Sequence, residues 1–194
     1  MEMPLPPEAT NDNARHITSG AGPLMYSLAD PRKRWFALAV LSFLVLFVDQ
    51  ASKYAIDRFT SPGAFRIVIP GLLNIVHTTN PGVAFGLFAD SASPMLAPLL
   101  IAFSIGVICL LLWLLATGRA GGWLGEWGLA LILGGAAGNV LDRAVRHSVI
   151  DFIDFHLGAY HWYTFNLADS AIVVGAALVV IELLRDWRPS SEHA

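Results

Sequence analysis

The sequence predicts an all-α integral membrane protein with four transmembrane helices, a small extracytoplasmic β-sheet and a periplasmic helix or loop. The composition is the first observation, because 55% of the 194 residues are hydrophobic and only 14% are charged. Soluble domains carry about 25% charged residues. The second observation is a set of four apolar stretches, each close in length to the roughly 20 residues that a helix needs to cross a bilayer. Lipid is therefore the expected solvent for most of the chain.

The predicted spans are residues 35–54, 95–116, 123–141 and 168–184. They belong to one membrane domain, residues 31–188. Residues 1–30 are rich in proline, glycine and asparagine without apolar periodicity, which predicts a disordered cytoplasmic tail. Residues 189–194 are predicted to form a short cytoplasmic C-terminal tail. The third span contains Gly134 and Gly138, which share a helix face and favour close helix packing.

Basic residues beside the spans predict the orientation, since cytoplasmic loops carry the excess of Lys and Arg. One side holds residues 32–34, Arg119, Arg185 and Arg188. The opposite side holds Arg58, Arg66, Arg143 and Arg146, so the bias is modest. We expect the first side to be cytoplasmic, with both termini there.

Two longer segments, residues 57–92 and 142–168, lie on the outer side in this topology. Residues 65–70 and 72–77 are rich in β-branched and aromatic residues, which predicts a small sheet on the membrane surface. Tyr160, Trp162 and Tyr163 precede the fourth span, where aromatic side chains commonly anchor at the interface.

Ionisable and amide side chains gather at the outer ends of the spans. An ionisable group within a span costs roughly 2.5 to 3.5 kcal/mol and is a functional candidate by default. If the four helices form a bundle, these groups converge at one depth. They are Asp49, Lys53, Asn139, Asp142, Arg143, Asp151, Asp154, Asn166 and Asp169.

Most of these residues also have a purely structural interpretation. Asp49 and Lys53 are four apart and can form an ion pair on one helix face. Asp142 beside Arg143 can mark the point where the helix meets water. Asp169 can lie near a helix N-terminus, where the dipole stabilises a carboxylate. Asp151 is harder to explain in this way, because it lies between Ile150 and Phe152.

Paired carboxylates are the chemistry that this cluster favours. Two aspartates in close contact share one proton, so one member can activate water while the other protonates a carbonyl oxygen. The residues alone leave open which two act among Asp142, Asp151, Asp154 and Asp169. A metal is disfavoured because zinc prefers His and Cys, and the histidines lack ligand spacing.

Two other classes of protein remain open from the residues. One is a small membrane transporter that uses the carboxylates as a cation or proton site. Transporters usually bind near the midplane, whereas these groups gather at one face. The other is a non-catalytic assembly factor whose polar patch packs helices. The net charge of −3 gives no indication of nucleic-acid binding.

Five short motifs resemble one family. They are DQASK at 49–53, NPGVAF at 80–85, GGAAGNVLDR at 134–143, VIDF at 149–152 and FNLADS at 165–170. Their order is similar to that of the lipoprotein signal peptidases, also called signal peptidase II, and the resemblance covers residues 35–187. Pro81 departs from the small polar residue that the family more often has.

The resemblance implies an aspartyl endopeptidase whose catalytic pair is Asp151 and Asp169. It implies substrate-binding or site-ordering roles for Asn80, Gly82, Asn139, Arg143 and Asn166, and supporting roles for Asp49, Lys53 and Asp142. The substrate would be a prolipoprotein with a diacylglyceryl cysteine, cut just before that cysteine.

The resemblance also implies a location and partners. The enzyme would be a multi-pass protein of the bacterial inner membrane, with both termini cytoplasmic and the active site facing the periplasm. It would need no metal or organic cofactor. Its partners would be the prolipoprotein, membrane lipid and globomycin-like inhibitors.

Overall fold

A computed structural model describes residues 30–82 and 95–187 of the chain. The predicted tails, residues 1–30 apart from Asp30 and residues 189–194, lie outside this part, as do residues 83–85 of the second motif. The chain divides into two units, Met1–Ala37 and Leu38–Ala194. In the first unit a helix begins at Pro31, where Asp30 Oδ1 accepts a hydrogen bond from the Arg32 N–H (2.9 Å). The helical packing and the site described below belong to the second unit.

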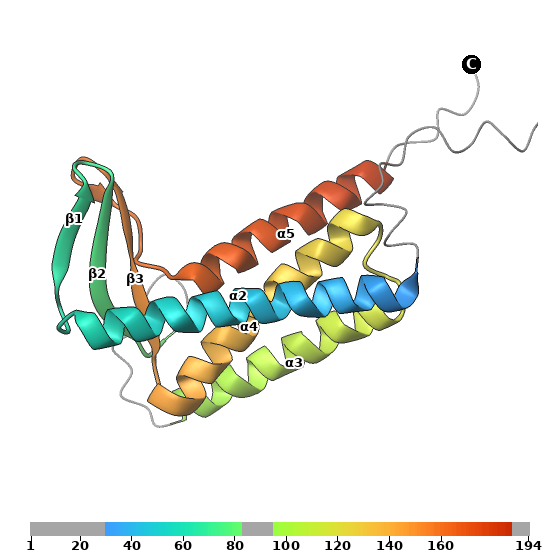
Figure 1. The fold of residues 1–194 in the computed structure, drawn as a ribbon, viewed down its shortest axis with the longest axis horizontal. Coiled ribbons are helices and arrows are strands. Elements are labelled where there is room, and N and C mark those ends of the chain that lie inside the picture. Colours follow the sequence, from blue (N-terminus) through green and yellow to red (C-terminus); the bar gives the residue numbers. More distant parts are fainter. Residues whose placement is uncertain (1–29, 83–94, 188–194) are drawn as a thin grey trace, which may run out of the picture. The chain divides into compact units, whose positions relative to one another are not determined.

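Four helices carry the predicted spans (Figure 1). They are α2 (Pro31–Phe59), α3 (Leu96–Ala116), α4 (Trp123–Arg146) and α5 (Leu167–Asp186). All four are long and apolar enough to cross a membrane. Helices α2 and α4 run past the predicted ends of their spans by about one turn, because helical hydrogen bonding continues after the apolar run ends.

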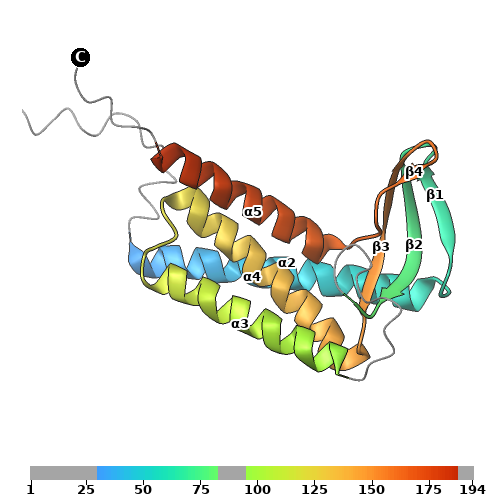
Figure 2. The same cartoon turned by 180° about the vertical axis from the view of Figure 1, so that it is seen from behind.

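Helix α4 lies at the centre of the packing and contacts both α3 and α5 (Figure 2). Glycines allow the close approach, since a Cβ on Gly128 would lie 2.6 Å from the carbonyl oxygen of Gly175 on α5. A Cβ on Gly134 would lie 2.5 Å from the carbonyl oxygen of Ser42 on α2. The predicted role of Gly134 and Gly138 in close packing is therefore confirmed.

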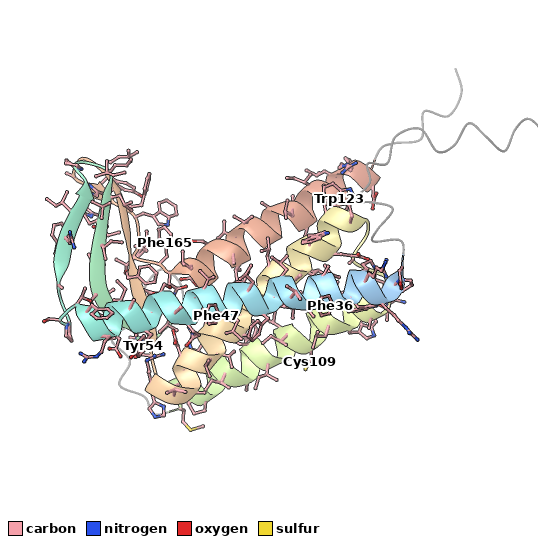
Figure 3. The ribbon with its side chains drawn as sticks, in the orientation of Figure 1. Phe36, Phe47, Tyr54, Cys109, Trp123 and Phe165 are labelled. Carbon is pink, nitrogen blue, oxygen red and sulfur yellow. The ribbon has the colours of Figure 1, made fainter. Side chains whose placement is uncertain are left out.

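Apolar side chains also cover the outer surfaces of these helices. Phe47 and Cys109, both labelled in Figure 3, are exposed, as are Phe43, Phe103 and Val173. In water this surface would favour aggregation, whereas in a bilayer it contacts lipid. Buried apolar residues are correspondingly few in the described part of the chain. Leu38, Leu111, Leu115, Leu129 and Ala130 form one cluster, and Val149, Ile150, Phe152 and Ala168 are also buried.

The outer segments form one four-stranded antiparallel sheet of order β1-β2-β3-β4. Its strands are β1 (Phe65–Ile69), β2 (Leu73–Asn80), β3 (Val149–Leu157) and β4 (Tyr160–His161). The prediction of β1 and β2 is confirmed, but it was incomplete because β3 and β4 come from the second outer segment. The two buried aspartates of β3 interrupt the apolar pattern expected of a strand, and pairing with β2 places them in the sheet.

Strand β3 connects the two helices that border the site. It follows the end of α4 directly, and β2 pairs with it through Asn80↔Val149 and Thr78↔Asp151. On its other side, the N–H groups of Phe152 (3.1 Å) and Ile153 (2.8 Å) both donate to the carbonyl oxygen of Phe165. This two-to-one pairing is a β-bulge, which fixes the chain just before α5 against β3.

Candidate active site

A cavity of about 810 Å³ lies where β2, β3, α4 and α5 meet; it is called the inner cavity below. Its polar lining comprises Asn80, Asn139, Arg143, Asp151 and Asp169. Its apolar lining includes Trp162, Phe165, Ile172, Val173 and Val174. The cavity therefore combines a carboxylate pair with a wall suited to apolar groups.

Asp151 extends from β3 into a set of amide donors. Asn166 Nδ2 donates to Asp151 Oδ1 (2.7 Å), and Asn80 Nδ2 donates to Asp151 Oδ2 (3.2 Å). The residue is only 2% exposed. Both carboxylate oxygens are thus held in position by side chains from two different outer segments.

Asp169 occupies the first turn of α5, where it forms a capping box with Asn166. The Asp169 N–H donates to Asn166 Oδ1 (3.0 Å), and the Asn166 N–H donates to Asp169 Oδ2 (3.3 Å). Asn139 Nδ2 from α4 donates to Asp169 Oδ1 (2.8 Å). Since Asn166 also donates to Asp151, this one asparagine contacts both aspartates.

The electrostatic coupling of the two aspartates is visible in the proton affinity of Asp151. Burial, followed by the negative charge of Asp169, raises the pKa of Asp151 to about 6. The hydrogen bonds from Asn80 and Asn166 and the charge of Lys53 oppose this rise. The pair is therefore suited to hold one proton near neutral pH, as acid–base hydrolysis requires.

A fully buried lysine lies beneath the pair. Lys53 Nζ is 2.9 Å from Asp49 Oδ2 and 2.7 Å from Asp142 Oδ2. It also donates to Asn139 Oδ1 (3.1 Å), which orients the Asn139 amide so that its Nδ2 group faces Asp169. The predicted Asp49–Lys53 pair is confirmed within α2, and Lys53 also connects α2 with Asp142 and Asn139 on α4.

Further contacts complete this buried ionic cluster of Asp49, Lys53 and Asp142. Gln50 Nε2 lies within hydrogen-bond distance of Asp49 Oδ2 (3.1 Å), the Gly138 carbonyl (3.2 Å) and Asp142 Oδ1 (3.2 Å). Arg146 also binds Asp142 Oδ1 (2.6 Å). Asp49 Oδ1 accepts the backbone N–H of Ala168 (2.9 Å), at the start of α5. The cluster therefore joins three helices, and Asn139 connects it to the aspartate pair.

Gly82 connects two of the predicted site residues. Its N–H donates to Asn80 Oδ1 (2.9 Å), which leaves the Asn80 amide group free to face Asp151. Its carbonyl oxygen accepts a hydrogen bond from Arg143 Nη2 (2.9 Å). The Arg143 guanidinium thereby holds the end of β2 against α4 at the edge of the inner cavity.

The four aspartates among which the residues alone could not choose a catalytic pair lie in different surroundings. Asp151 and Asp169 line the inner cavity, whereas Asp142 belongs to the buried ionic cluster. Asp154 instead bonds Asn74 (2.7 Å) and His161 (2.9 Å) and lines a second cavity. Burial would raise the pKa of Asp154, but these two hydrogen bonds and the nearby histidines lower it overall.

Several contributors to the site were missed from the sequence. Gln50 lies within the DQASK motif, whose second position could have identified it. Trp162 and Tyr163, predicted as interface anchors, line the inner cavity. The α5 residues Ile172 to Val174 gave no signal beyond their apolar character. Among residues 30–82 and 95–187, no three His, Cys, Asp or Glu side chains gather as a metal-binding group.

The fold and site define a class: a membrane enzyme with four spanning helices and a carboxylate pair at one end of the bundle. Residues 41–185 match the family model described as signal peptidase (SPase) II. The chain therefore belongs to the signal peptidase II family of bacterial membrane peptidases. Family membership gives no support to the transporter alternative.

Relatives and solved structures agree with this assignment. The lipoprotein signal peptidase of Solibacter usitatus (strain Ellin6076) is 42% identical over 161 residues, which cover 83% of this chain and 98% of that protein. The lipoprotein signal peptidase of Burkholderia cenocepacia (strain J2315) is 45% identical over 153 residues, covering 77% and 89%. A bacterial membrane enzyme solved by the in meso method at 2.3 Å resolution has a TM-score of 0.72 at 28% identity, covering 81% of this chain and 93% of that one.

Proposed function

We propose that this chain removes signal peptides from prolipoproteins by aspartyl endopeptidase chemistry at Asp151 and Asp169. The substrate carries a diacylglyceryl group on its cysteine, and the bond before that cysteine is cut. The observation that carries the proposal is the single asparagine, Asn166, that contacts both carboxylates at the edge of an apolar-walled cavity. Such a cavity can admit a lipid-bearing peptide from the bilayer.

The proposed reaction uses one proton shared by the pair. Asp151 carries that proton, because burial and the charge of Asp169 raise its pKa to about 6. A lipidated substrate excludes more water and raises the pKa of Asp151 further. The Asp169 carboxylate is stabilised by Asn139, by the capping box and by the positive end of the α5 dipole. Asp169 is therefore the general base and Asp151 the general acid.

In the first step a water molecule gives a proton to Asp169 as its oxygen attacks the scissile carbonyl carbon. Asp151 donates its proton to the carbonyl oxygen, which gives a neutral tetrahedral diol. In the second step Asp169 transfers its proton to the nitrogen of the cysteine, and Asp151 takes back a hydroxyl proton. The C–N bond then breaks, releasing the signal peptide and a free cysteine amino group.

The other predicted site residues have distinct proposed roles. Asn80, Asn139 and Asn166 orient the two carboxylates, and Gly82 fixes the orientation of Asn80. Arg143 binds a substrate carbonyl at the edge of the cavity. Asp49, Lys53 and Asp142 support the site from below. The same cavity is the proposed site for globomycin-like cyclic peptides, and no metal or organic cofactor takes part.

The decisive experiment compares aspartate variants on a diacylated prolipoprotein in detergent. We expect Asp151→Asn and Asp169→Asn each to lower kcat by roughly 10² to 10⁴-fold or more, because each removes one of the two proton carriers. Asp154→Asn serves as the matched control and should leave kcat nearly unchanged. Substantial cleavage by Asp151→Asn or Asp169→Asn would refute the assignment of these two residues as the catalytic pair.

The proposed topology has both termini in the cytoplasm and the site on the periplasmic side of the inner membrane. Basic residues beside the spans favour this orientation modestly. Residues 32–34, Arg119, Arg185 and Arg188 lie on the cytoplasmic side, against Arg58, Arg66, Arg143 and Arg146 on the other. A reporter fused after Ala194 is expected to be active only if it functions in the cytoplasm. A periplasmic signal from this fusion would overturn the topology.

A further inference from the structure

A second cavity, the outer cavity, lies on the sheet beside the aspartate pair. It has a volume of about 630 Å³ and is lined by Asp154, His161, Phe65 and Val76, among others. Thr78, Thr79, Trp162 and Thr164 line both cavities, so the two adjoin. A peptide substrate bound at the aspartate pair can therefore continue into the outer cavity without leaving the protein surface.

The two cavities differ in their surroundings. The inner cavity borders Ile172 and Val173 on the membrane-spanning helix α5, and the apolar signal peptide and acyl chains fit that side. Among the described residues, the outer cavity is bordered only by strands and by residues 62–64 and 161–164, outside the spanning helices. The part of the substrate that follows the cysteine must leave the bilayer, and the outer cavity offers it an adjoining surface outside the spanning helices.

We propose that the outer cavity binds the mature segment of the prolipoprotein and that His161 selects the residue near the third position after the cysteine. This inference rests on the proposed function. Asp151 and Asp154 are three residues apart on β3, which corresponds to at most about 10 Å along the strand, and the bulge at Phe152 and Ile153 lies between them. An extended substrate covers the same distance in about three residues.

The chemistry of His161 indicates which side chains it selects. Its Nδ1 bonds the Asp154 carboxylate, 2.9 Å from Oδ1 and 3.1 Å from Oδ2. An ionised carboxylate accepts hydrogen bonds only, so Nδ1 donates a proton to it. In the tautomer whose single proton is on Nδ1, the ring presents Nε2 as an acceptor. The His161 side chain is about half exposed, at 49%, and can be reached from the cavity. A hydroxyl side chain that donates to Nε2 is favoured, and an acidic one is disfavoured beside Asp154.

The neighbouring residues hold the His161 ring in place. Asn74 donates to Asp154 Oδ2 (2.7 Å), and the ring of His156 stacks on that of His161 at 4.5 Å with an interplanar angle of 6°. The carboxylate and the stacked ring together fix the direction in which Nε2 points. His161 is thus a preorganised acceptor for substrate recognition, remote from the bond that breaks.

The test measures binding of diacylglyceryl-cysteine lipopeptides whose scissile amide is reduced to an amine and cannot be cleaved. One peptide ends two residues after the cysteine, and two continue for five residues with Ser or Ala at the third. With the wild-type chain in detergent, we expect the Ser peptide to bind roughly three- to tenfold more tightly than the Ala peptide, the value of one hydrogen bond. His161→Ala should abolish this difference, and Tyr160→Ala, the exposed neighbour on β4, should preserve it.

Equal binding of the short peptide by wild type and His161→Ala would show that the variant is folded. Equal binding of the Ser and Ala peptides by the wild-type chain would overturn the proposal, as would an unchanged preference in His161→Ala. Weaker binding of the short peptide by His161→Ala would also overturn it, since that result means a structural role. Because binding is measured without turnover, these results do not depend on the assignment of Asp151 and Asp169 as the catalytic pair. That assignment is tested separately, and cleavage by Asp151→Asn or Asp169→Asn would refute it.

Discussion

The carboxylate of Asp151 accepts two amide hydrogen bonds, and its pKa nevertheless rises to about 6. Hydrogen bonds to a carboxylate favour the charged form, but burial and the charge of Asp169 outweigh them here. The amides therefore fix the position of the oxygens without abolishing the proton affinity that hydrolysis needs. Position and proton affinity are set by different neighbours of the same residue.

The pH dependence of cleavage follows from this balance. The active pair holds one proton, and the fraction of Asp151 that is protonated falls as pH rises through about 6. We expect kcat/KM of the free enzyme to decrease towards a tenfold loss per pH unit above that value. For kcat the decrease should begin at higher pH, because bound substrate excludes water. Asp154→Asn should leave the pH at which each profile falls unchanged, and a kcat/KM that rises between pH 6 and 8 would contradict the assignment.

Asn166 has two separable roles, and two substitutions distinguish them. Asn166→Ala removes both the cap of α5 and the donor to Asp151, so we expect a loss of about 1 kcal/mol in the free energy of unfolding together with a large loss of kcat. Asn166→Ser keeps a capping oxygen but shortens the donor, and should lower kcat with little change in stability. Thermal unfolding and cleavage assays on the same preparations check this, and equal kcat for Asn166→Ser and wild type would contradict the role at Asp151.

At the residue scale, the sequence identified the polar residues of the site but not which neighbours each of them contacts. The polar residues at the span ends and the motifs named Asp49, Lys53, Asn139, Asp151, Asn166 and Asp169 before any coordinates. Residue spacing could not separate Asp151 from Asp154, because their difference arises from neighbours distant in sequence. Asn80 and Asn166 reach the first, whereas Asn74 and His161 reach the second.

At the scale of elements, helix α4 packs closely against its neighbours because several of its positions are glycines, which have no side chain. Gly128, Gly134, Gly135 and Gly138 each bring a neighbour so close that a Cβ could not fit without movement. At Gly138 the neighbour is the Asp49 carboxylate, so the glycine also gives space to the buried ionic cluster. The spans were predictable from their length and apolar character. The strand β3 was not, since its aspartates interrupt the apolar pattern and its partners lie about 70 residues earlier in the chain.

Gly138→Ala tests the importance of this close approach. The new Cβ would lie 2.5 Å from Asp49 Oδ2, so we expect displacement of the Asp49–Lys53 pair, a lower unfolding temperature and reduced kcat. The matched control is Gly106→Ala on α3, where no atom lies within 4 Å of the added Cβ. Alanine has the higher helix propensity, so the control should be neutral or slightly stabilising, by up to about 1 kcal/mol. Equal unfolding temperatures for the two variants would show that Gly138 has no such role.

At the scale of the whole molecule, the buried ionic cluster joins α2, α4 and the start of α5 beneath the aspartate pair. Lys53 is fully buried and has two carboxylate partners and one amide partner. Removing one member of a buried pair leaves an uncompensated charge, which is more costly than the loss of the pair as a whole. The cluster is therefore a point at which a local change affects three helices.

Lys53→Met is expected to lower the free energy of unfolding by about 3 to 5 kcal/mol, because Asp49 and Asp142 lose their shared cation. Lys33→Met, at the other lysine of the chain, is the control and should have little effect, since Lys33 is exposed. Adding Asp142→Asn to Lys53→Met should restore part of the stability by removing one unpaired charge. Detergent-resistance or thermal-unfolding measurements would check all three, and a Lys53→Met protein as stable as wild type would contradict this account.

The ion pairs within α2 and α4 also bear on how the chain enters the membrane. Asp49 with Lys53 on α2 and Asp142 with Arg146 on α4 are each four residues apart, so each helix neutralises its own carboxylate. A translocated helix that carries both members of a pair avoids the cost of a lone charge in lipid. The Lys53–Asp142 contact forms only once the two helices meet. Insertion and lateral assembly can therefore follow one another without exposing Asp49 or Asp142 unpaired to the acyl chains.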